Sequence, residues 1–103
     1  MLILGRQVGQ SLRVGDFRLI LRGRNSKDAE ITLVYGHRVR IMTVAYTLAF
    51  KLGKSITITP YPHRGNEFIS ERAMNQVNFH IRAPRDVPVI RDEIEATRTA
   101  QGQ

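Results

Sequence analysis

Short runs of β-prone residues, separated by glycine and proline, limit what this chain of 103 residues can fold into. Apolar and polar residues alternate over residues 10–14, and Leu12 and Val14 share one side of that run, which is the pattern of a half-buried strand. The pair Gly15-Asp16 is typical of a tight turn, and a second strand is expected over residues 17–22. Further strands are expected over residues 1–4, 29–35, 55–59, 76–81 and 87–91. The sequence therefore predicts a mainly β fold with a hairpin near the N-terminus.

Two stretches are expected to be helical. In RVRIMTVAYTLAFKLG, residues 38–53, β-branched residues favour a strand, but apolar residues recur at the three- and four-residue spacing of one helical face, and Gly53 follows as a stop. From Asp92 onward, acidic residues suit the first turn of a second helix, and Arg98 suits its C-terminal end. One helix is thus expected in the middle of the chain and one at the C-terminus.

Positive charge is concentrated in the first two thirds of the chain. The whole protein carries a formal charge of +7, and residues 1–64 hold eleven basic and three acidic side chains, whereas residues 65–103 hold five and six. Such a field attracts polyanions through counterion release and Coulomb attraction. The charge is compatible with a nucleic-acid partner.

Several classes of chemistry are disfavoured. The chain has no cysteine, which excludes disulfides, thiolate catalysis and zinc–thiolate sites. His37, His63 and His80 lack metal-ligand spacing, and neither a phosphate-binding glycine loop nor a nucleophile motif is present. We therefore expect no catalytic residue, metal or cofactor. A small ribonuclease that uses His63 with nearby glutamates is the less favoured enzymatic alternative.

Apolar stretches end well before the roughly 18 residues that a membrane span needs, and no signal peptide pattern opens the chain. A cytoplasmic protein without a membrane partner is expected. The apolar start MLIL must nevertheless be held by another segment, because chain termini otherwise fray.

Two pieces of the sequence resemble one family. The opening, MLIL-x-R-x-VG-x-x-L-x-x-GD, and a later stretch, NQVNFHIRAPRDVPVIRDEI, resemble the two ends of the carbon storage regulator family (CsrA/RsmA) of bacterial RNA-binding translational regulators. The pieces cover residues 1–22 and 75–95 in the family's order. The resemblance implies one CsrA/RsmA-like domain over residues 1–103, with residues 23–74 as an insertion between the second and third family strands.

The resemblance also implies an interlaced, strand-exchanged β homodimer. In that arrangement the first strand of one chain lies beside the last strand of the other, so residues 1–4 would pair with residues 87–91 of the partner and two exposed sheet edges would be closed. The dimer would supply burial that a small domain lacks.

Family members bind GGA motifs in the loops of messenger leaders and regulatory small RNAs, and mostly repress translation. By resemblance, the main RNA-facing residues are Leu4, Arg6, Val89 and Arg91, and the secondary ones are Ile3, Ala83, Pro84, Val87 and Ile94. The expected protein is a non-enzymatic, homodimeric RNA-binding regulator without a small-molecule substrate.

Some positions depart from the family pattern. Gly5 stands where the family usually has threonine, Gln7 replaces a frequent arginine, and Pro88 lies in the expected RNA-facing strand although it cannot donate to a ladder. The alternative is therefore a structural or protein-binding dimer whose insertion covers or alters the RNA edge. The insertion could instead add RNA contacts through its basic residues Arg38, Arg40, Lys51 and Lys54.

Overall fold

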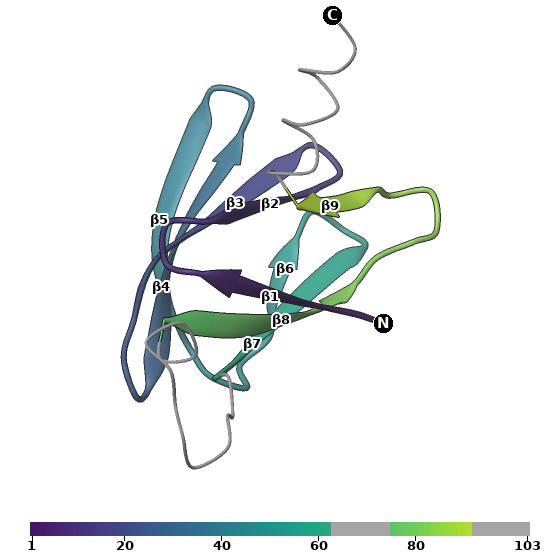
Figure 1. Ribbon diagram of the computed structural model, residues 1–103. Coiled ribbons are helices and arrows are strands. Elements are labelled where there is room, and N and C mark those ends of the chain that lie inside the picture. The colour runs from purple at the N-terminus through teal and green to yellow at the C-terminus, as the bar shows by residue number, and fades with distance from the viewer. Residues whose placement is uncertain (63–74, 92–103) are drawn as a thin grey trace, which may run out of the picture.

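The computed structural model describes residues 1–62 and 75–91, and these residues form only strands, turns and connecting segments (Figure 1). The strands in this part of the chain are β1 (Leu2–Gln7), β2 (Ser11–Val14), β3 (Phe17–Arg24), β4 (Asp28–Tyr35), β5 (Arg38–Ala45), β6 (Phe50–Leu52), β7 (Ile56–Pro62), β8 (Gln76–Arg82) and β9 (Val89–Arg91).

The strands form two antiparallel sheets. The first, sheet A, has the order β1-β8-β7-β6, and the second, sheet B, has the order β5-β4-β3-β2-β9. The chain passes from sheet A to sheet B between β1 and β2, returns to sheet A at β6, and ends its described part in sheet B at β9. Strands from residues 23–62, which the resemblance would treat as part of an insertion, therefore belong to both sheets.

The predicted N-terminal hairpin is confirmed. β2 and β3 pair from Ser11 opposite Ile20 to Val14 opposite Phe17. The turn between them needs a left-handed residue, and Gly15 supplies it with a φ of 58°. The alternation also holds, because Leu12 and Val14 are fully buried.

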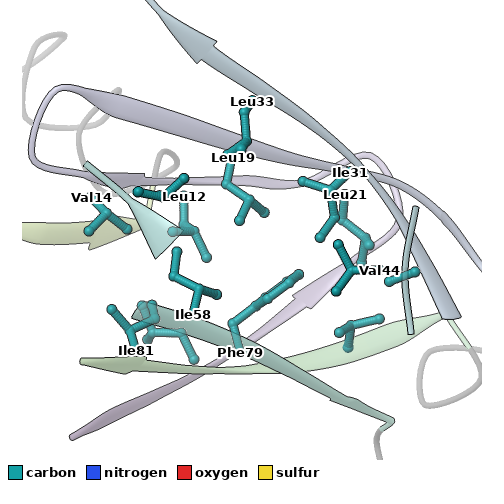
Figure 2. Packing of buried hydrophobic residues seen from close by; sticks show 14 of the residues in the cluster. Leu12, Val14, Leu19, Leu21, Ile31, Leu33, Val44, Ile58, Phe79 and Ile81 are labelled. Carbon is teal, nitrogen blue, oxygen red and sulfur yellow. The ribbon is translucent and has the colours of Figure 1, made fainter. Parts of the chain in front are cut away.

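The core lies between the facing sides of the two sheets. Figure 2 shows Leu12, Leu19 and Leu21 of sheet B directed toward Ile58 and Phe79 of sheet A. Burial of such side chains is the main favourable term in folding. The two sheets therefore share one hydrophobic core.

The helix expected over residues 38–53 is wrong. β5 pairs with β4 along its whole length, and β6 pairs with β7. β-branched residues are frequent in β5, and Gly36, with a φ of 58°, makes the turn from β4. Ile41 and Val44, which would share a helical face, lie on opposite sides of the strand, with exposed fractions of 81% and 4%. Hydrogen bonding to the neighbouring strand and β-branching outweighed the helix-like spacing.

The predicted fold class, mainly β with one helix in the middle of the chain and one at the C-terminus, is thus wrong, because the described part of the chain is all β. The described residues contain no helix, and the C-terminal helix was expected after Asp92, which lies outside the described residues. β1 and β9 each find one partner within the chain and are the edge strands of sheet A and sheet B, so the pairing of β1 with the last strand of a second chain stays a prediction. β1 pairs with β8 from Leu2 opposite Ile81 onward, and β9 pairs with β2. The apolar N-terminus is therefore held by β8.

Candidate nucleic-acid interface

A groove of about 500 Å³ lies between the start of β1 and the segment that joins β8 to β9. Two arginines, Arg82 and Arg85, and seven residues of apolar type line it, and the lining surface is more polar than apolar. The apolar residues are Met1, Leu2, Ile81, Ala83, Pro84, Val87 and Val89. Four of the residues predicted to face RNA, from positions 83 to 89, are therefore gathered at one place.

Backbone hydrogen bonds shape the far wall of this groove. The Val87 N–H donates to the Pro84 carbonyl at 3.0 Å, which closes a turn, and the Gly15 N–H donates to the Pro88 carbonyl at 2.8 Å. Pro88 precedes β9, whose first residue, Val89, lies opposite Val14. The absent N–H of Pro88 therefore interrupts no ladder, and β9 is shorter than the strand expected over residues 87–91.

Leu4 and Arg6 do not reach this groove. Both side chains point to the inner side of β1, with exposed fractions of 9% and 5%. Arg6 Nε donates to the Gly5 carbonyl at 2.8 Å, and its Nη1 donates to the Ser11 carbonyl at 3.2 Å. The guanidinium is thus occupied by backbone acceptors, because the pleat places Arg6 on the same face as Leu4.

Arg91 has a different environment. It lies opposite Leu12 in the β9–β2 ladder and is half-buried. Its Nε is buried and has no hydrogen-bond partner in the described part of the chain. An unsatisfied buried donor is costly, because it has lost its hydrogen bond to water without gaining another acceptor. Ile94, the last of the predicted secondary residues, lies outside the described residues.

Ile3, one of the predicted secondary RNA-facing residues, is exposed on the outer side of sheet A. In the strand registers, Ile3 is opposite His80, and His80 is opposite Thr59. The His80 ring lies against the Tyr61 ring with centroids 4.1 Å apart and planes tilted by 39°. We call Ile3, His80, Thr59 and Tyr61 the outer-face platform.

A second hollow, of about 270 Å³, adjoins this platform. Its lining includes Thr57, Thr59, Tyr61, His80 and Arg82. Arg82 and Met1 line both this hollow and the groove, which makes the two a continuous surface. The alternation of β7 and β8 was the signal that could have placed Tyr61 and His80 on one exposed face.

Gly5 also belongs to this outer face. A Cβ at Gly5 would collide with the side-chain amide of Gln76 and would lie 3.1 Å from Asn78 Oδ1. Gln76 Nε2 donates to Asn78 Oδ1 at 3.1 Å across this space. The hydrogen-bonded Gln76 and Asn78 side chains therefore occupy the space that a threonine at position 5 would need.

The charges around the surface favour anions. Acidic residues in the described part of the chain are Asp16, Asp28, Glu30 and Asp86, and none of them lines the groove or the hollow. Among the same residues, no three histidine or carboxylate side chains are grouped as a metal ion would require. Nor does any helix in residues 1–62 and 75–91 have the length and apolarity to cross a membrane. The arrangement of cations and flat rings is suited to an anionic ligand that carries flat rings.

Comparison with known proteins finds no matching family model, no matching curated protein and no matching solved structure.

Proposed function

We propose that this protein is a non-enzymatic, RNA-binding regulator that takes unpaired nucleotides onto the surface formed by the outer-face platform and the groove. The observation that carries the proposal is the position of Arg82, which lines both the hollow beside the Tyr61 and His80 rings and the groove.

Aromatic rings on an open sheet face are suited to unpaired bases. Sequence-specific RNA recognition generally uses single-stranded loops, whose bases can stack on tyrosine or histidine rings. Such stacking contributes about 1–3 kcal/mol per base and tolerates any base. Tyr61 and His80 supply the rings, and the exposed Ile3 side chain extends the platform.

Arginines at the same surface supply charge and base selection. Arg82 and Arg85 can neutralise phosphates, and a guanidinium can donate two hydrogen bonds to a guanine edge. Arg91 lines neither the groove nor the hollow, so the proposal does not depend on it. Arg6, in contrast, supports the fold, so this proposal transfers the main cationic role from Arg6 to Arg82.

The target follows from the resemblance to the carbon storage regulators. GGA motifs in the loops of messenger leaders or small RNAs are the proposed ligands, and coverage of a ribosome-binding site in the cytoplasm is the proposed means of repression. The proposed protein is a homodimer, and the free sides of the edge strands β1 and β9 are where the strands of a second copy can pair. Sedimentation equilibrium over a range of concentrations measures whether that association occurs.

Fluorescence anisotropy with a labelled RNA hairpin tests the function. A GGA loop should bind more tightly than the same hairpin with a CCU loop, and Arg82→Gln and His80→Ala should each weaken binding of the GGA hairpin by roughly tenfold. Lys27→Gln, which removes an exposed charge that lines neither hollow, is the matched control and should have less than about a twofold effect.

Two other outcomes would contradict different parts of the proposal. Equal affinity for both loops would overturn the GGA assignment and leave a sequence-tolerant binder. No binding to either hairpin at low salt would overturn RNA binding and favour the structural or protein-binding alternative.

A further inference from the structure

A second cleft lies away from the proposed RNA surface, at the end of the two sheets where β3 begins, β4 ends and β5 begins. Its volume is about 520 Å³, which is within the range of small-molecule pockets. β6 and the following Gly53 form the opposite wall. We call this space the β5–β6 cleft.

Aromatic and aliphatic side chains form its apolar wall. The rings of Phe17 and Tyr35 are stacked, with centroids 4.6 Å apart and planes inclined by 24°. Phe50 of β6 also lines the cleft, as do Leu33 and Leu52, which are both buried. Tyr35 remains 48% exposed, so part of the aromatic pair is open to a ligand.

Three cationic side chains also line the cleft. Arg38 is opposite Tyr35 and Arg40 is opposite Leu33 in the β4–β5 ladder, so both arginines share the inward side of the sheet. Lys51 of β6 lines the cleft from the other sheet. Among the described residues, no carboxylate lines it.

The polarity of β5 is inverted over its first half. Arg38 and Arg40 lie on the side that faces the cleft, whereas Val39 and Ile41 lie on the outer side, with exposed fractions of 64% and 81%. Inward charges on an edge strand also discourage edge-to-edge association. Protection of the edge strand requires neither the stacked aromatic pair nor the lysine from the opposite sheet. An anionic ligand that carries a flat ring accounts for the inward arginines, for Lys51 and for the aromatic pair together.

We propose that the β5–β6 cleft binds a nucleotide. The planar base would lie against the Phe17–Tyr35 pair, where ring stacking and burial stabilise it, and the phosphate would lie among Arg38, Arg40 and Lys51. The nucleotide is either free or part of an RNA strand, since both present the same base and phosphate. The cleft and the proposed RNA surface share no lining residue.

Isothermal titration calorimetry with GMP tests the proposal. Guanosine, which lacks the phosphate, and ribose 5-phosphate, which lacks the ring, should each bind at least roughly tenfold more weakly than GMP. The double variant Arg38→Gln/Arg40→Gln should weaken GMP binding by at least roughly tenfold, because two charge-assisted contacts are lost. The matched control, Arg18→Gln/Lys27→Gln, removes two exposed charges that do not line the cleft. It should change the affinity for GMP by less than about twofold.

Tyr35→Ser tests the ring separately. It should weaken GMP and guanosine binding while leaving ribose 5-phosphate binding unchanged. Thermal unfolding of each variant establishes that the fold is retained, and Tyr35→Phe should keep the affinity for GMP if stacking is the interaction.

The source of the nucleotide is separated by competition. If GMP displaces the labelled hairpin and Arg38→Gln/Arg40→Gln weakens hairpin binding, the cleft holds a nucleotide of the RNA. If both measurements leave the hairpin unaffected, the ligand is a free nucleotide. Ribose 5-phosphate or octanoate binding as tightly as GMP, or no GMP binding at millimolar concentration, would overturn the proposal while leaving the RNA function untouched.

Discussion

Arg6 in β1 donates a hydrogen bond from Nη1 to the backbone carbonyl of Ser11 in β2, at 3.2 Å. This bond runs from a strand of sheet A to a strand of sheet B, and it satisfies an acceptor beside the core. Arg6 is therefore part of what holds the N-terminal strand in place.

Replacement of Arg6 should destabilise the fold. Arg6→Ala removes donors to two carbonyl groups and leaves a space beside the core, so the free energy of unfolding should fall by about 2–4 kcal/mol. Urea denaturation measures the loss. The RNA affinity of the protein that remains folded should be unchanged. If Arg6→Ala instead kept normal stability and abolished RNA binding, the direct contact between Arg6 and RNA that the family resemblance implies would be supported.

The packing at Gly5 predicts a coupling with Gln76. Gly5→Thr should lower the free energy of unfolding by about 0.5–1.5 kcal/mol, because the new side chain displaces the Gln76 amide from Asn78. In a Gln76→Ala background the same substitution should cost close to nothing. A double-mutant cycle from urea denaturation measures the difference, and additive effects would show that the two positions do not interact.

The strand assignment of residues 38–45 predicts unequal effects at two positions. Ile41→Thr should change the free energy of unfolding by less than about 0.5 kcal/mol, because Ile41 is exposed. Val44→Thr should cost about 1–3 kcal/mol, because it places a hydroxyl in the core. Thermal unfolding compares the two, and equal large losses would indicate the helical face instead.

Tyr46 predicts a stability change in alkaline solution. Burial raises the pKa of its phenol above the ordinary value of roughly 10, while Arg24 lowers it and Asp28 raises it by smaller amounts. Tyr46 Oη also donates to the Asn25 carbonyl at 2.8 Å. The raised folded pKa means that its stabilising contribution is complete below the unfolded pKa and is lost as the pH rises toward the folded pKa.

The comparison of wild type with Tyr46→Phe isolates this contribution. Denaturant midpoints measured from pH 8 upward should fall more steeply for the wild type above roughly pH 10, so the stability difference between the two proteins should shrink. Parallel pH profiles would contradict the assignment.

Local patterns in the sequence were sufficient for much of the fold. The alternation that buries Leu12 and Val14, together with the glycine turn at position 15, predicted the β2–β3 hairpin correctly. The strands expected over residues 29–35, 55–59 and 76–81 correspond to β4, β7 and β8. The sequence did not indicate Arg82 and Arg85 as site residues, because their place at the groove depends on which other segments pack around them.

What the sequence by itself determined is which segments are extended and where the chain turns, because alternation, β-branching and glycine turns act between residues a few positions apart. Only the tertiary structure decided that β1 pairs with β8, that residues 38–45 form a strand beside β4, and that Arg6 points inward while Tyr61 meets His80. The physical reason is that strand partners and side-chain neighbours are selected by hydrogen bonds and burial between segments far apart in the chain. A short apolar run is equally compatible with several such partners.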